Sequence, residues 1–304
     1  MTDMKPPPLK NDCFALPPGV DWTPVNEAMA LLKSRLTPVV GAPESVPVAD
    51  ACDRILAQDV MARRANPPAS NSAVDGYGFK GPIAEGLNVL PLMEGRAAAG
   101  VPFPGEVPKG SAVRILTGAI LPPGVDTVVL EEDCSIEPNR IGFNGPLKAG
   151  ANTRNAGEDI TAETPIFRAG RRLNAPDLAL LASAGIGAVS VYPRLTVGVL
   201  STGDEIKEPG DAAENWQIYD ANRLMLLAML SELGFVACDL GLVEDQRDLV
   251  RAALDCGAET CDLILTSGGA SAGDEDHVSA ILKSEGELNS WRIALKPCRP
   301  LALG

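Results

Sequence analysis

The sequence predicts a multidomain protein of α/β and β type, with a small β domain inserted into a mixed N-terminal domain and an α/β domain after it. Strand-like and helix-like segments alternate from residue 194 to the end of the 304-residue chain. Short apolar runs lie between many proline and glycine residues at positions 61–154, which is typical of a small β domain. Mixed segments flank this stretch on both sides, so we expect the β domain to interrupt another domain.

The N-terminal domain is predicted to be discontinuous and to consist of residues 21–60 and 155–193. In its first part, Thr23 precedes a proline, as at many helix starts, and apolar residues follow at helical spacing. In its second part, residues 176–185 have a helix-like pattern and residues 188–192 have a strand-like one. We therefore expect the chain to return to this domain after the β insertion.

Two loops of the predicted β domain have residues that suit a binding site. Asp75 precedes Gly76 among small polar residues, and an Asp-Gly pair is most often a tight turn. Thr117 and Gly118 follow a strand-like run, which is compatible with a ligand loop or with a plain strand end. The residues of each loop alone do not decide whether the loop is a functional site or a plain turn.

The α/β domain, residues 194–304, is predicted to have a Rossmann-like parallel sheet. Its first three strands are predicted at 195–200, 236–243 and 262–266, with helices between them. The loops after these strands are STGDE (201–205), VEDQ (243–246) and SGGASAGDED (267–276). Because the strands are parallel, all three loops are expected at the same edge of the sheet.

This edge collects carboxylates and a glycine-rich loop. The acids are Asp204, Glu205, Asp245, Asp274, Glu275 and Asp276. Their mutual repulsion costs free energy unless a cation lies among them, which suggests magnesium. The glycine-rich loop precedes a predicted helix at 277–283, so its N–H groups suit a phosphate, although a plain turn is the alternative. Arg292, Lys296 and Arg299 would then meet the phosphate or simply neutralise the acids.

Composition limits the classes of function. The net charge is −14, which argues against nonspecific binding to nucleic acid or to an anionic membrane. The seven cysteines are scattered and odd in number, as in a reducing compartment. Residues 1–20 are rich in proline, lack the apolar core of a signal peptide and are predicted to form a mobile tail. We expect a cytoplasmic protein.

Seven motifs taken together resemble one family. They are SNSAVDGYG, RILTGAILPPGVDTVVLEED, AGEDI, LSTGDEI, IYDAN, TSGGASAGDEDH and KPCRP, in this order. The chain from about Asp21 onward is similar to the MoeA/gephyrin E-domain family, the molybdopterin molybdenumtransferases. The resemblance implies an elongated homodimer with a MogA-like α/β domain. It also implies insertion of molybdenum from molybdate into adenylylated molybdopterin, with release of AMP and with Mg²⁺ as cofactor.

The resemblance also implies roles for particular residues. The functional acids and the threonine of the family fall on Asp75, Thr117, Asp159, Glu205, Asp245 and Asp276. Of these, Glu205, Asp245 and Asp276 are the expected metal ligands. The expected substrate-binding residues are Ser267, Gly268, Gly269, Ser271, Gly273, Arg292 and Lys296. The likeness implies further that Asp75 and Thr117 of one subunit face the α/β domain of the other.

The sequence departs from the family in several places. Cys298 replaces the glycine of the KPGKP motif and Arg299 replaces its last lysine, while Val74 stands where methionine is common. Cysteine adopts a positive φ less readily than glycine, so the approach of a ligand at that turn is expected to change. The PGNP-type loop and the small C-terminal β domain of the family are not in the sequence, which therefore resembles a truncated portion. A pterin-nucleotide binder without turnover and a scaffold protein are the competing functions.

Overall fold

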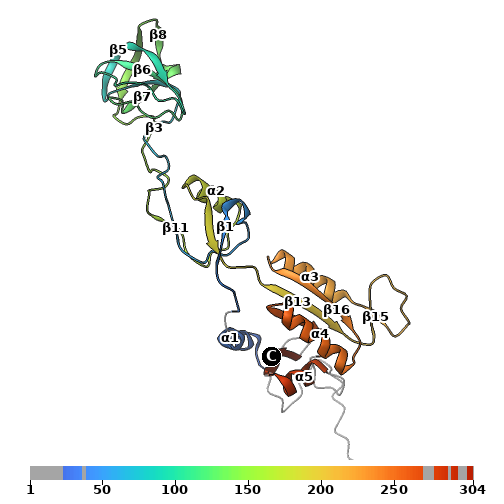
Figure 1. Cartoon of the computed structure of the whole chain (residues 1–304). Coiled ribbons are helices and arrows are strands. Elements are labelled where there is room, and N and C mark those ends of the chain that lie inside the picture. Colours follow the sequence, from blue (N-terminus) through green and yellow to red (C-terminus); the bar gives the residue numbers. More distant parts are fainter. Residues whose placement is uncertain (1–22, 36–38, 270–276, 287–288, 294–299, 304) are drawn as a thin grey trace, which may run out of the picture. The chain divides into compact units, whose positions relative to one another are not determined.

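The computed structural model describes residues 23–35, 39–269, 277–286, 289–293 and 300–303, the strands at 289–292 and 300–303 by their backbone alone (Figure 1). The contacts divide the chain into two compact units. We call Ala42–Pro193 the β-rich unit, and Met1–Gly41 with Arg194–Gly304 the α/β unit.

The α/β unit contains the predicted alternation of strands and helices. Its elements are α1 (Val25–Arg35), β13 (Thr196–Thr202), β14 (Ile206–Lys207), β15 (Ile218–Tyr219), α3 (Ala221–Glu232), β16 (Val236–Val243), α4 (Arg247–Thr260), β17 (Leu263–Ser267), α5 (His277–Glu285), β18 (Asn289–Arg292) and β19 (Pro300–Leu303). A three-stranded parallel sheet has the order β16-β13-β17. The chain crosses from β13 to β16 and then back past β13 to β17. Because such crossovers are right-handed, α3 and α4 lie on opposite faces of the sheet (Figure 1).

The central position of β13 explains its uninterrupted apolar sequence. Val197 and Val199 are fully buried and pack against Leu230 of α3. On the opposite side, Gly198 leaves no room for a side chain, since an added Cβ would lie 2.6 Å from a methyl carbon of Leu240. A strand that is covered on both faces reads as a continuous apolar run, as the sequence indicated.

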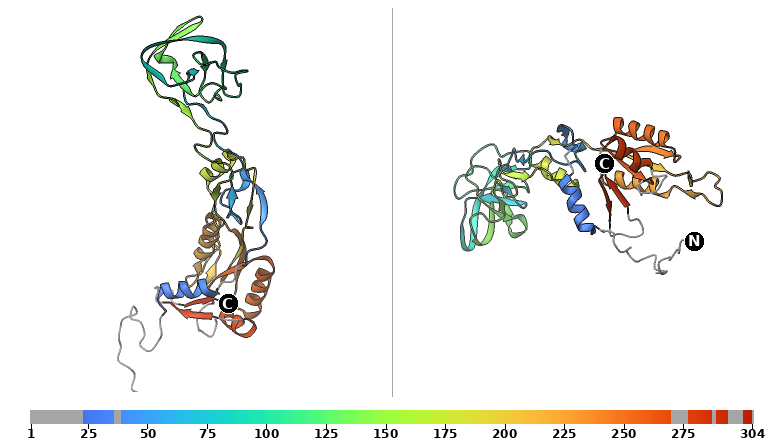
Figure 2. Two further views of the ribbon diagram at one scale, coloured as in Figure 1. Left: turned by 90° about the vertical axis from the view of Figure 1, so that its left-hand side faces the viewer. Right: turned by 90° about the horizontal axis from the view of Figure 1, so that it is seen from below.

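The β-rich unit contains a six-stranded sheet in the order β7-β4-β6-β5-β9-β8. Its strands are β4 (Gly76–Phe79), β5 (Ile83–Ala97), β6 (Ala112–Ile115), β7 (Thr127–Leu130), β8 (Ser135–Glu137) and β9 (Arg140–Leu147). The sheet curls around a core that includes the stacked rings of Phe79 and Phe143, whose centroids are 5.3 Å apart (Figure 2). The short runs between turn residues are therefore strands, as predicted.

The remainder of the β-rich unit pairs segments from before and after this sheet. Its elements are β1 (Glu44–Pro47), β2 (Val60–Met61), β3 (Asn71–Ser72), β10 (Thr153–Arg154), β11 (Pro165–Phe167), α2 (Ala175–Ser183) and β12 (Ala188–Val191), with short 3₁₀ turns at Val48–Asp50 and Glu131–Asp133. The antiparallel pairs are β1 with β12, β2 with β11 and β3 with β10. Each pair joins a segment that precedes the six-stranded sheet in the sequence to one that follows it, as expected for an insertion.

The placement of α1 differs from the prediction. The sequence assigned residues 21–60 to the first domain, whereas α1 falls in the α/β unit. The reason is a contact across the chain, because Thr23 forms a parallel bridge with Ile293. The division into three domains stays a prediction, and the expected tail at 1–20 lies outside the described residues. None of the described helices is long and apolar enough to cross a membrane.

Candidate functional site

Three acids gather where β13 and β16 end. The N–H group of Asp245 donates to the Oδ1 atom of Asp204 at 3.0 Å. Burial raises the pKa of Asp245, and the negative charges of Asp204 and Glu205 raise it further, while His277 opposes them. The Nε2 atom of His277 lies 2.8 Å from the carbonyl oxygen of Asp245 and donates to it, since a carbonyl only accepts. Three of the six acids predicted at this edge thus lie together, while Asp274, Glu275 and Asp276 lie outside the described residues.

Burial of Asp245 and the repulsion by its neighbours together predict the effect of removing its charge. With a raised pKa, folded Asp245 holds its proton more tightly than the unfolded chain does, so the ionised form destabilises the fold. This penalty is absent below the unfolded pKa and grows as pH rises toward the folded pKa. We expect Asp245→Asn to raise the melting temperature at pH 7 by about 2–4 °C. The control Asp211→Asn, at an exposed position, should leave it unchanged, and a loss of stability in Asp245→Asn would contradict the prediction.

Gly203 shapes the loop that carries Glu205. Its φ of +153° belongs to a region that side chains rarely adopt, and a Cβ there would lie 2.6 Å from the Oε2 atom of Glu205. The carboxylate of Glu205 therefore lies directly over a residue without a side chain. Because the Glu205 side chain could move aside, the positive φ rather than this contact is the main reason for a glycine before the two acids of the loop.

The glycine-rich loop begins at the end of β17. Gly268 and Gly269 have φ values of +105° and +64°. A Cβ on Gly268 would lie 2.4 Å from the carbonyl oxygen of Thr202, and a Cβ on Gly269 would lie 2.8 Å from a methyl carbon of Val278. The first part of the loop is therefore held against the end of β13, next to the acids. Of the other predicted site residues, Ser271, Gly273, Asp276 and Lys296 lie outside the described residues, and only the backbone of Arg292 is described.

Two residues of α3 were not among the predicted site residues. The Nδ2 atom of Asn222 donates to the Oγ atom of Ser267 at 3.0 Å. Arg223 is 5% exposed and pairs with Asp220, Asp239 and Glu208. The motif IYDAN was a signal for Asn222, which lies in the first turn of α3, two residues after the residue that caps the helix. The cap is Asp220, whose Oδ1 atom accepts from the N–H group of Arg223.

In the β-rich unit, Asp75 and Thr117 form a specific pair. The Oδ1 atom of Asp75 accepts from the N–H group of Thr117 at 2.6 Å and from its hydroxyl at 2.7 Å. These two hydrogen bonds, the hydroxyl first, lower the pKa of Asp75, and the charge of Arg114 assists them. Both residues are exposed. The second oxygen of the Asp75 carboxylate has no described partner, so the pair presents an oriented, ionised oxygen at the surface.

Asp159 belongs to a different local arrangement. Its Oδ1 atom accepts from the Nη2 atom of Arg154 at 2.6 Å, and its N–H group donates to the carbonyl oxygen of Asn66. Glu158 accepts from the same arginine. Within the described residues, no hydrogen bond or ion pair connects Asp159 with Asp75. Its predicted catalytic role therefore stays a prediction.

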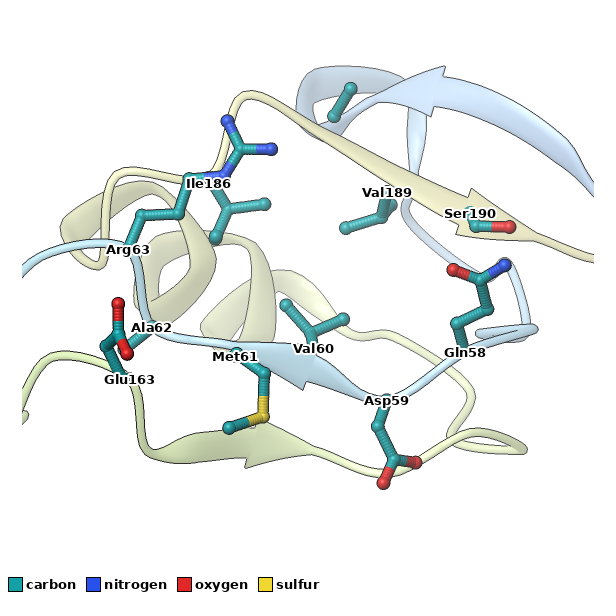
Figure 3. Close-up of a pocket in the computed structure, with 11 residues that line it drawn as sticks. Gln58, Asp59, Val60, Met61, Ala62, Arg63, Glu163, Ile186, Val189 and Ser190 are labelled. Atoms are coloured by element: carbon teal, nitrogen blue, oxygen red, sulfur yellow. The ribbon is translucent and has the colours of Figure 1, made fainter.

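A cavity of about 610 Å³ lies elsewhere in the β-rich unit, between β2 and β12 (Figure 3). Val60, Ile186 and Val189 supply its apolar part, and Arg63 extends along one end. Backbone hydrogen bonds join the segments on either side of it, one from Ala57 to Ser190 and one from Arg63 to Ala184. None of the predicted site residues lines this cavity.

The acidic edge partly fits a divalent cation. Carboxylate oxygens are the ligands that magnesium prefers. Burial raises the pKa of Asp245 most, and the negative charges of Asp204 and Glu205, which raise it further, would be offset by a cation. In the part of the chain that the structure describes, no three acids, histidines or cysteines lie together closely enough to hold a metal ion. Glu205 and Asp245 are two of the three expected ligands, and the third, Asp276, lies outside the described residues, so the metal site stays a prediction.

The fold and this edge define the class of protein. It is a multidomain α/β protein whose glycine-rich loop and acids meet at the carboxyl ends of parallel strands, where such sheets bind ligands. Two family models then match the chain. The MoeA N-terminal region (domain I and II) matches residues 23–185, and the probable molybdopterin binding domain matches residues 198–304. The chain therefore belongs to the MoeA family.

Relatives and solved structures agree with this assignment. The chain is 39% identical to the molybdopterin molybdenumtransferase of Haemophilus influenzae over 257 residues. This aligned region covers 84% of this chain and 63% of that protein. It is 32% identical to the enzyme of the same name from Synechococcus elongatus, over 90% of this chain and 70% of that one. The crystal structure of a molybdopterin biosynthesis MoeA protein from Pyrococcus horikoshii matches with a TM-score of 0.77 and 29% identity, over 93% of this chain and 71% of that chain. This chain thus spans less than two thirds of the Haemophilus protein's length.

Proposed function

We propose that this protein acts in molybdenum cofactor biosynthesis as a molybdopterin molybdenumtransferase. It inserts molybdenum from molybdate into adenylylated molybdopterin and releases AMP. The proposal rests on one observation. The first glycines of the SGG loop pack against the end of β13, beside Asp204, Glu205 and Asp245, at one edge of the sheet. The names of the relatives, and the match to a probable molybdopterin binding domain, support the same substrate class.

Each part of the site has a task in this proposal. Ser267 and the backbone of Gly268 and Gly269 bind phosphate oxygens, because the loop leads into α5 and glycine allows close approach. Glu205 and Asp245, with Asp276, hold magnesium. When bound, the metal supplies a Lewis acid that stabilises charge on the phosphate oxygens. As the family resemblance implies, Asp75, oriented by Thr117, offers its ionised carboxylate to a donor group of the substrate bound by the other subunit.

The proposal includes a homodimer in the cytoplasm. The family resemblance supports the dimer, and the scattered cysteines support a reducing compartment. Sedimentation of the purified protein at several concentrations tests the dimer directly. A chain that stays monomeric at micromolar concentration would remove this part of the proposal.

Release of AMP is the decisive measurement. Purified protein is mixed with adenylylated molybdopterin, molybdate and MgCl₂, and AMP is quantified with time. We expect multiple turnovers that stop when molybdate is omitted or when EDTA is added. Binding of the nucleotide without release of AMP would instead identify a pterin-nucleotide binder that has no turnover. Absence of both would contradict the proposal altogether.

A further inference from the structure

The hydrogen bond between Asn222 and Ser267 connects two parts of the chain that are 45 residues apart. Asn222 is the second residue of α3, and Ser267 is the last residue of β17, immediately before the glycine-rich loop. The Nδ2 atom of Asn222 is the donor and the Oγ atom of Ser267 is the acceptor, at 3.0 Å. The amide therefore holds the first hydroxyl of the loop.

The first turn of α3 is firmly anchored, so the amide has a defined position. Asp220 caps the helix and also pairs with the buried guanidinium of Arg223 at 3.0 Å. The same guanidinium pairs with Asp239 of β16 at 2.5 Å and with Glu208. These contacts fix the helix start relative to the sheet, while Asn222 itself stays exposed at the edge.

The direction of the hydrogen bond decides what Ser267 offers to a ligand. A serine hydroxyl has one proton to donate and two lone pairs that accept. Because Oγ accepts from the amide of Asn222, its proton stays available for an acceptor outside the pair. Polarisation along such a chain strengthens the outer hydrogen bond. The hydroxyl thus suits an anionic oxygen, as phosphate groups provide.

We propose that Asn222 is a positioning residue that orients the Ser267 hydroxyl as a donor to a phosphate oxygen of the substrate. The identity of that substrate rests on the proposed function, whereas the donor role does not. Asn222 itself need not touch the ligand. The adjacent Gly268 and Gly269 pack closely against Thr202 and Val278, where a Cβ would not fit, so the backbone beside the hydroxyl is held in place.

Two substitutions test the direction of the bond. Asn222→Asp keeps the shape of the side chain but turns the donor into an acceptor. The Ser267 hydroxyl would then donate to the new carboxylate instead of the ligand, and a negative charge would face the phosphate. Asn222→Ala leaves the hydroxyl unoriented. The control Asn88→Asp alters an asparagine of the β-rich unit whose Nδ2 atom bonds only backbone carbonyls, those of Ala84 and Gly86.

The experiment measures pyrophosphate binding by titration calorimetry and the steady-state release of AMP. We expect Asn222→Asp to weaken pyrophosphate binding by at least about 10-fold and Asn222→Ala by about 5-fold, the size of one ordinary hydrogen bond. KM for the adenylylated substrate should rise more than kcat falls. Thermal melting should be unchanged, and Asn88→Asp should bind as the wild type does.

A double-mutant cycle separates positioning from direct contact. In a Ser267→Ala background, Asn222→Ala should change pyrophosphate affinity by less than about 2-fold, because its effect passes through the missing hydroxyl. Equal effects in both backgrounds, wild-type binding by Asn222→Asp, or no pyrophosphate binding by the wild type would each overturn the inference. A wild type that binds pyrophosphate but releases no AMP would overturn only the proposed function.

Discussion

Replacing Arg223 by methionine is expected to destabilise the α/β unit by about 3–5 kcal/mol, the cost of breaking a buried ion pair from one side. The guanidinium is 5% exposed and pairs with Asp220, Asp239 and Glu208. Asp220 is itself 3% exposed, so its carboxylate would be left buried with no countercharge. Methionine fills a similar volume, which isolates the loss of charge from the loss of packing. Chemical unfolding followed by circular dichroism measures the difference.

A matched surface pair sets the scale for this result. Arg251 pairs with Glu285 at 2.8 Å, but its side chain is 50% exposed. Arg251→Met should therefore cost less than about 1 kcal/mol. Arg223→Lys should cost an intermediate free energy of unfolding. A lysine ammonium lacks the planar, forked donors of the guanidinium and cannot contact all three carboxylates. If Arg223→Met and Arg251→Met cost the same, the buried cluster does not hold the first turn of α3.

Asp75→Asn is expected to lower the rate of AMP release by at least about 100-fold, as loss of a functional carboxylate does. Asparagine preserves an oxygen that accepts from Thr117, so the local geometry survives while the charge disappears. Asp75 is exposed, so the melting temperature should hardly change. Since its pKa lies below the usual range, the wild-type carboxylate stays ionised throughout the neutral range, and this effect should not depend on pH there.

The control for Asp75 is another hydrogen-bonded acid in the same unit. Asp126 accepts from the N–H group of Gly81 and from the hydroxyl of Thr127, and it pairs with Lys80. Asp126→Asn should leave AMP release within about 2-fold, because it removes a charge without touching the Asp75 pair. Equal loss of activity in both variants would show that charge anywhere in the β-rich unit matters. Full activity of Asp75→Asn would leave Asp75 as a turn residue.

Local patterns in the sequence determine most elements of the α/β unit. The apolar run of β13, the glycine after α3 and the helical periodicity of α4 each depend on neighbours within a few residues, which the sequence displays directly. Parallel strands with short loops then place Glu205, Asp245 and the glycine-rich loop at one edge. The family motifs supply Asp75, whose own surroundings indicate only a turn.

The tertiary structure decides which distant residues meet. The partners of Asp75 and Asn222 lie 42 and 45 residues away, and no local pattern encodes either hydrogen bond. The bridge between Thr23 and Ile293 is hidden from the sequence for the same reason, because its two residues lie near opposite ends of the chain. Arg223 occupies an ordinary helical position in the sequence and becomes a buried ion-pair centre only because β16 and the loop before α3 converge on it. Such contacts depend on strand order and register, which arise from packing the whole unit rather than from the residues beside them.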